Sequence, residues 1–112
     1  MNDKSQMLKG ILEGCILRVI SNRETYGYEI SERLKASGFS EISEGTIYPL
    51  LMRLERSGLI AATFIDSPFG PKRKYFNVTQ KGEAEIQSFL VNWQDLKKSV
   101  NTLFIIKGDE VL

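Results

Sequence analysis

Residues 43–60 read SEGTIYPLLMRLERSGLI, and the rest of the chain is best understood from this segment. Its apolar residues at positions 47, 50, 51 and 54 follow the spacing that places side chains on one face of a helix. Ser43 is a good N-cap, and Gly58 stands where a helix often ends in a left-handed residue. We therefore predict a helix between Ser43 and Gly58 that buries this apolar stripe.

The opposite face of this helix lacks the Glu–Lys pairs of an ordinary solvated surface. Pro49 costs helix stability, because it has no backbone donor and clashes with the carbonyl four residues before it. A residue that destabilises its own helix without a local benefit indicates a functional surface. Two interpretations stay open. The segment is either an amphipathic core helix whose exposed face has no binding role or a helix that enters a DNA groove. The residues of this face are Gly45, Thr46, Tyr48, Pro49, Met52, Arg53 and Arg56.

The composition fits one globular domain without a usual catalytic centre. The 112 residues are 42% hydrophobic and 26% charged, and they include one cysteine and no histidine. Zinc sites of the usual ligand types and Ser-His or Cys-His nucleophiles are therefore excluded. No glycine-rich phosphate-binding motif occurs either. We expect no enzyme activity, no metal and no cofactor.

The charge balance gives no bulk argument for nucleic acid. Fifteen basic and fourteen acidic residues leave a formal net charge of +1, so any such argument must rest on where the charges lie. No apolar run approaches the length of a membrane helix, and the polar start is not a secretion signal. A single cysteine fits a reducing compartment. We expect a cytoplasmic protein that does not enter the membrane.

Two helices are predicted before the central segment. The first spans about Ser5–Ile20 and carries Cys15 in its apolar stripe, where we expect a buried apolar residue rather than a reactive thiol. Gly10 and Gly14 weaken this helix by about 0.8–1 kcal/mol each relative to alanine, which close approach of another backbone would explain. The second helix spans about Tyr26–Ser37, with Gly38 as its C-terminal cap.

Tyr26 and Tyr28 open the second helix and allow two roles. Their rings could pack against the core or point at a nucleic-acid phosphate. Because tyrosines usually bury their rings, packing is favoured. The short connection FSEIS between the second and third helices makes a helix-turn-helix geometry available.

After Gly58 the sequence changes to a pattern typical of a β-hairpin. Strands are predicted at Leu59–Ile65 and Lys72–Val78, on either side of the turn cluster DSPFGP. The second strand begins with three cations in a row, at positions 72–74. These charges either solubilise a loop edge or, together with Arg53 and Arg56, straddle a phosphate backbone.

The last predicted helix runs from about Gln80 to Ile106, with Thr79 as its N-cap. Its apolar residues are separated alternately by three and four positions, which is the a/d seam of a coiled coil. A helix of about 26 residues is about 39 Å long, whereas the preceding residues make a body of about 25 Å. The exposed overhang predicts a two-fold homodimer. The seam residues are Ile86, Phe89, Trp93, Leu96, Val100 and Leu103.

The order of the predicted elements is that of a winged helix-turn-helix with a dimerisation arm, mainly α with a β-hairpin. Residues 1–78 would form the DNA-binding domain, and residues 79–112 the dimerisation helix and tail. The chain also resembles the PadR-like transcriptional regulators, in the short branch without a separate C-terminal domain. The matching segments are YGYEI at 26–30, GTIYPLLMRLE at 45–55, GLI at 58–60, RKYF at 73–76 and TQKG at 79–82.

The resemblance implies a homodimeric, sequence-specific DNA-binding regulator, usually a repressor that leaves its operator when a small molecule binds. The helix after Ser43 would be the recognition helix and the hairpin the wing. A symmetric dimer would read double-stranded DNA at a near-palindromic operator. The implied DNA-binding residues are Ser43, Thr46, Tyr48, Pro49, Arg53, Lys72, Arg73 and Lys74.

Trp93 matches the tryptophan that lines a flat pore between subunits in the multidrug-binding members, so Trp93 and Phe89 are candidates for binding a small aromatic effector. A tryptophan that only fills the dimer core explains the residue equally well. The alternative function is a winged helix that makes protein contacts alone, with Tyr48 and Arg53 as anchors.

Overall fold

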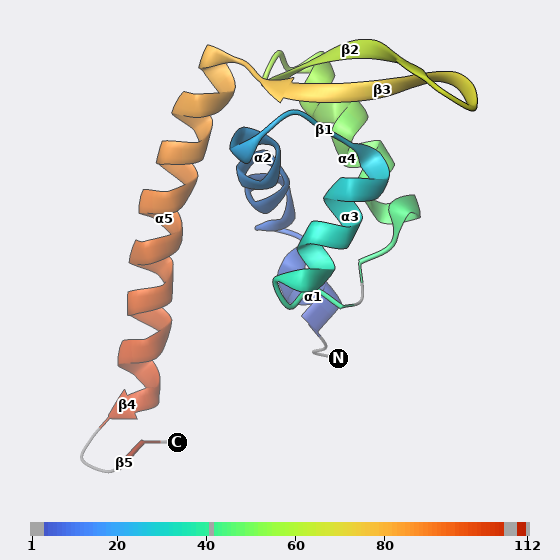
Figure 1. Ribbon diagram of the computed structural model, residues 1–112. Helices are drawn as coiled ribbons and strands as arrows, with labels where there is room; N and C mark the ends of the chain where they lie inside the picture. Colours follow the sequence, from blue (N-terminus) through green and yellow to red (C-terminus); the bar gives the residue numbers. More distant parts are fainter. Residues whose placement is uncertain (1–3, 41, 107–109, 112) are drawn as a thin grey trace.

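The computed structural model describes residues 4–40, 42–106 and 110–111. Helices α1–α4 form a body, the β2–β3 hairpin projects past it, and α5 runs as a rod along the side of α2 (Figure 1). The elements in order are α1 (Lys4–Leu8), α2 (Leu12–Asn22), β1 (Thr25–Tyr26), α3 (Gly27–Ala36), α4 (Glu44–Arg56), β2 (Ile60–Ser67), β3 (Gly70–Val78), α5 (Gln80–Phe104), β4 (Ile105–Ile106) and β5 (Glu110–Val111).

Helix α4 forms as its sequence predicts. The Ser43 hydroxyl accepts a hydrogen bond from the Thr46 N–H at 3.3 Å, which confirms the N-cap. Gly58 follows the helix with φ 77°, a left-handed conformation that an L side chain disfavours. Ile47, Leu51 and Leu54 are buried in the core, and Leu50 is half-buried at its edge. The amphipathic pattern therefore fixes which face of α4 is exposed.

The predicted first helix is broken, and this prediction was wrong in its continuity. A turn at residues 9–11 separates α1 from α2, and Gly10 lies in this turn with open space where a Cβ would stand. At Gly14 the close neighbour is the ring of Phe89 from α5, which a Cβ would overlap. The glycine thus admits an aromatic side chain, not the backbone that was expected.

A short strand that the sequence did not predict precedes α3. Thr25 and Tyr26 form β1, which pairs antiparallel with β3, so the sheet has the order β1-β3-β2. Its register places Thr25 opposite Phe76 and Tyr26 opposite Tyr75. Helix α3 consequently begins at Gly27 rather than at Tyr26. This pairing anchors the base of the wing to the helical body.

The wing is longer than predicted. Strands β2 and β3 continue into the turn cluster as far as the Ser67–Gly70 pair, with an irregularity between Ile65 and Ser67. Only Pro68 and Phe69 remain in the turn. The hairpin therefore extends its tip well clear of the helices (Figure 1).

Helix α5 starts on the body and then leaves it. The Thr79 hydroxyl accepts from the Gly82 N–H at 3.1 Å and donates to the Gly58 carbonyl at 2.7 Å, so the predicted N-cap also ties α5 to the end of α4. Ile86 is only 5% exposed and belongs to the core of its own chain, which corrects its assignment to a dimer interface. The helix ends at Phe104, two residues earlier than predicted, because Ile105 and Ile106 pair with β5.

Beyond Phe89 the apolar row on α5 is exposed, at Trp93, Leu96, Val100 and Leu103. The principal extents of 61 × 28 × 21 Å show the elongation that an overhanging helix gives. Among the helices that the structure describes, none combines the length and apolar character needed to cross a membrane.

Candidate nucleic-acid interface

The exposed face of α4 holds the predicted contact residues. Ser43, Thr46, Tyr48 and Pro49 are all exposed along its first turns. Pro49 leaves the Gly45 carbonyl without its intrahelical donor, and because Gly45 is exposed, water can bond to it. The helix therefore presents its N-terminal half as an open surface of hydroxyl and aromatic groups.

The Tyr48 ring extends from α4 to the start of α3. A Cβ built on Gly27 would lie 2.6 Å from the Tyr48 hydroxyl, so the ring position depends on the glycine. A crevice of about 140 Å³ continues from this contact to the base of the wing. The structure thus brings the exposed face of α4 and the wing together. The crevice is lined by Tyr26, Gly27, Tyr48, Leu51, Met52, Arg73, Lys74 and Phe76.

An aromatic and cationic stack fixes the wing beside α3. The Arg73 guanidinium lies over the Tyr26 ring, 4.4 Å from its centroid, and the Tyr75 ring meets Tyr26 edge-on at 5.2 Å. Such cation–π contacts contribute about 0.5–1 kcal/mol at exposed sites. Tyr26 therefore packs as favoured, although its ring is half-buried against wing residues and not in the core. Tyr28, in contrast, is exposed, and the expectation that it packs was wrong.

Two of the predicted phosphate-binding cations already have carboxylate partners. Arg53 pairs with Glu13 of α2 at 2.6 Å, and Lys74 pairs with Glu55 of α4 at 3.0 Å. Both pairs are partly exposed, and pairs of this kind contribute about 0–1 kcal/mol. A phosphate can therefore compete for either cation. The sequence did not reveal these pairs, because the partners are separated by 40 and 19 residues.

Lys72 is the freest cation of the wing. Its side chain is exposed, and no carboxylate of the residues that the structure describes lies within ion-pair distance of it. Lys72 and Arg73 thus leave positive charge on the outer part of the hairpin, while Lys74 holds the hairpin to α4.

Phe89 and Trp93, the residues predicted to bind an effector between subunits, have different surroundings within one chain. Phe89 packs on Gly14 and lines a small cavity of about 120 Å³ with residues of α2, α4 and α5. Trp93 lies one turn farther along α5 and is partly exposed. Cys15 lies half-buried in α2, and burial raises the pKa of its thiol, which fits the predicted apolar role. No cluster of metal-ligating side chains occurs within the described ranges.

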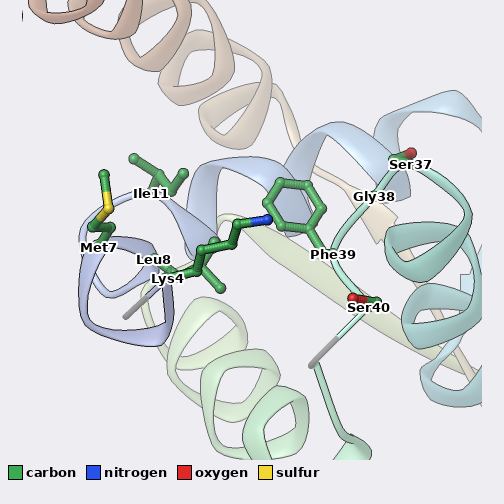
Figure 2. Close-up of a pocket in the computed structure, with 8 residues that line it drawn as sticks. All are labelled: Lys4, Met7, Leu8, Ile11, Ser37, Gly38, Phe39 and Ser40. Atoms are coloured by element: carbon green, nitrogen blue, oxygen red, sulfur yellow. The ribbon is translucent and has the colours of Figure 1, made fainter. Parts of the chain in front are cut away.

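A larger cavity lies at the end of the body away from the wing, between α1 and the connection that follows α3. Its volume is about 290 Å³, and its lining is mainly apolar (Figure 2). In Figure 1, α1 and the free end of α5 lie at this same end of the molecule. The lining residues are Lys4, Met7, Leu8, Ile11, Ser37, Gly38, Phe39 and Ser40.

Comparison with known proteins agrees with this arrangement. The sequence model described as "Transcriptional regulator PadR-like family" matches residues 16–88. A PadR-like transcriptional regulator from Bacillus cereus is 48% identical, with a TM-score of 0.82 over 91% of this chain and 99% of that chain. The negative transcriptional regulator PadR of Bacillus subtilis is 29% identical over 88% of this chain, which spans 55% of that protein.

The structure of Bacillus subtilis PadR in complex with operator DNA has the same fold, with a TM-score of 0.67 over 75% of this chain and 48% of that chain at 24% identity. The helical body with its β2–β3 wing and long α5 is accordingly a winged helix with a C-terminal helical arm. This chain belongs to the PadR-like family of transcriptional regulators.

Proposed function

We propose that the chain is a sequence-specific DNA-binding repressor that acts as a homodimer and is released from its operator by a small aromatic ligand. One observation carries the proposal: the open face of α4 and the cationic wing meet at one crevice. A major groove accepts one α-helix, and cations beside that helix fall near the phosphates that border the groove. The Bacillus subtilis relative in complex with operator DNA supports this assignment.

The residues divide by the part of DNA that they reach. Thr46 and Tyr48, on the first turns of α4, are placed for base edges, and Ser43 at the helix N-terminus suits a phosphate. Lys72 and Arg73 supply phosphate contacts from the wing. Arg53 joins them once phosphate replaces Glu13 as its partner. Direct contacts by α4 give sequence preference, and the cations give affinity at low salt.

The dimer is supported by two apolar surfaces at the same end of the molecule. One is the exposed α5 row of Trp93, Leu96, Val100 and Leu103, and the other is the cavity beside α1. A second copy related by a two-fold axis can cover both. In such a dimer the two α5 rows face each other, and the α5 arm of each copy lies in the α1 cavity of the other. Such a dimer would hold two α4 helices for half-sites about 34 Å apart in a near-palindromic operator.

The effector proposal rests on Trp93. In a two-fold dimer seamed along α5, the two Trp93 rings face a shared space in which a planar ligand can stack. Because the arms set the separation of the α4 helices, a ligand there changes operator affinity. Aromatic compounds should quench Trp93 fluorescence. Equal binding of such a compound by the wild type, Trp93→Phe and Trp93→Ala, measured by calorimetry, would leave Trp93 as dimer packing only.

The test is fluorescence polarisation with labelled duplexes from the DNA upstream of the chain's own coding sequence. A scrambled duplex of the same length and composition serves as the control. Saturable binding that survives excess scrambled competitor, and that Tyr48→Ala weakens at least about 10-fold, supports the proposal, since a good base contact contributes about 1–3 kcal/mol. Equal affinity for both duplexes contradicts sequence specificity. Absence of binding at low salt would favour a winged helix that makes protein contacts through Tyr48 and Arg53.

A further inference from the structure

The tip of the wing exposes an aromatic side chain that fold stability does not explain. Phe69 is 98% exposed, and Phe64, on the neighbouring strand, is 62% exposed. Ile65 adds a third exposed apolar residue to the same hairpin. Phe64 and Ile65 lie farther back on β2, opposite Lys74 and Arg73. Single exposed apolar residues are common, but an aromatic ring left almost fully exposed at the end of a projecting element indicates a contact.

The turn holds Phe69 outward. Pro68 precedes it and Pro71 follows two residues later, so two backbone φ angles near the turn are fixed. The ladder closes at Ser67 and Gly70, which leaves Pro68 and Phe69 as the whole turn. Folding therefore presents one aromatic ring at the farthest point of the wing, on a turn whose backbone is restricted by the two prolines.

The wing is long enough to span the distance between adjacent grooves. Phe76 is buried beside α4, and Phe69 lies seven residues earlier on the hairpin. At about 3.3 Å per residue, the tip reaches about 23 Å from that crevice. Adjacent major- and minor-groove centres are separated by half of a 34 Å turn, about 17 Å. When α4 occupies a major groove, the wing is long enough to enter the next minor groove.

Two cations and one acid lie within four residues of Phe69. Lys72 is exposed without a carboxylate partner among the described residues, and Arg73, the next residue of β3, lies over the Tyr26 ring of β1. Asp66, at the irregularity of β2, is the acid nearest to the turn in sequence. The cations can flank the groove at its phosphates while the ring enters it. Apolar side chains that enter a minor groove commonly unstack a base step.

We propose that Phe69 is an apolar wedge that enters the minor groove beside the major groove occupied by α4 and partly unstacks one base step. The proposal rests on the proposed DNA-binding function. It adds a specificity determinant that reads DNA deformability instead of base edges. Because pyrimidine–purine steps unstack most easily, the operator should carry a TA or CA step about half a helical turn outward from each α4 contact.

The experiment compares the full-length wild type with Phe69→Ser and Phe69→Leu. Each protein is used to select duplexes from a random pool, and the selected operator is then labelled with 2-aminopurine at the wing-facing step. Val91→Ser is the matched control, since Val91 is an exposed apolar residue of α5 outside the apolar row. We expect 2-aminopurine fluorescence to rise on binding of the wild type, Phe69→Leu and Val91→Ser, but not of Phe69→Ser.

Phe69→Ser should also bind the selected operator about 5- to 100-fold more weakly, as expected for loss of one aromatic contact with bases, and its own selection should lose the pyrimidine–purine step. Binding by Phe69→Ser with wild-type affinity, selected sequence and fluorescence would overturn the wedge and leave the proposed function intact. Unchanged DNA binding with weaker self-association in sedimentation would assign Phe69 to a contact between copies, and would also overturn it. Failure of the wild type to bind any duplex would reject the proposed function itself.

Discussion

The Tyr48 ring of α4 occupies the space that a side chain at Gly27 would fill. This contact joins the exposed face of α4 to the first residue of α3, so the aromatic group that we propose for DNA contact is held by a second helix. The relationship makes Gly27 a positioning residue for Tyr48, although Gly27 itself is buried and cannot reach DNA.

Gly27→Ala should displace the Tyr48 ring and weaken operator binding about 10-fold, as expected for one disturbed base contact. Polarisation measures the binding, and thermal unfolding shows that the variant remains folded. In a Tyr48→Ala background the same change should have little further effect on binding, because the displaced ring is already gone. Additive losses in the double variant would show that Gly27 acts through something other than Tyr48.

Lys72→Ala should weaken binding to specific and scrambled duplexes alike. Each lost phosphate contact reduces the magnitude of the slope of log affinity against log salt by about 0.9. Lys97→Ala is the matched control, since it removes the same charge from an exposed position on α5, away from the wing. Titrations between about 50 and 200 mM salt give the slopes. Equal slopes for the wild type and Lys72→Ala would contradict a phosphate contact at this position.

Glu13→Gln should strengthen DNA binding. The carboxylate holds Arg53 at 2.6 Å, and the neutral amide leaves the guanidinium free for a phosphate. The free energy of unfolding should fall by less than about 1 kcal/mol, because the pair is partly exposed. In an Arg53→Ala background, Glu13→Gln should lose most of its effect on binding. A gain that persists there would come from the general reduction of negative charge.

Gly14→Ala should destabilise the fold by about 1–3 kcal/mol, since the added methyl overlaps the Phe89 ring and forces α2 and α5 apart. Gly10→Ala is the control, because the space around Gly10 is open. Urea unfolding compares the two. A smaller residue at position 89, as in Phe89→Leu, should recover part of the loss at Gly14. Equal stability of Gly14→Ala and Gly10→Ala would contradict the close packing of these helices.

The sequence was informative where one local rule determines the structure. The Ser43 and Thr79 caps, the left-handed Gly58 and the buried stripe of α4 all follow from residues within a few positions of one another. The patterns of the successive segments also predicted the order of elements, from helices to wing to α5, and the family resemblance agreed with that order. These features needed no knowledge of contacts between distant segments.

The features that were missed depend on residues far apart in the chain. Strand β1 is two residues long and exists only because β3 offers it a partner. The Glu13–Arg53 pair and the Phe89–Gly14 contact join different helices, and no pattern in either helix reveals them. Ile86 fits the heptad seam by spacing, yet the body of the same chain buries it. Periodicity identifies an apolar row but does not say which surface covers each part of it.

Leu96→Glu should disrupt the proposed dimer, and Leu96 tests it better than Ile86, because Leu96 is exposed within one chain whereas Ile86 is part of the core. Two copies of a glutamate at a two-fold seam face each other across an apolar surface, which disfavours burial of their charge. Sedimentation at micromolar concentration should show the wild type as a dimer and Leu96→Glu as a folded monomer.

Val91→Glu is the control for this variant, since Val91 is exposed on α5 outside the seam and should tolerate the same charge without dissociation. The Leu96→Glu monomer should also bind a single half-site with no preference for the half-site spacing of the full operator. That outcome would show that pairing through α5 sets the distance between the two α4 helices. A wild-type chain that sediments as a monomer, or a Leu96→Glu chain that remains dimeric, would place the interface, if any, on another surface.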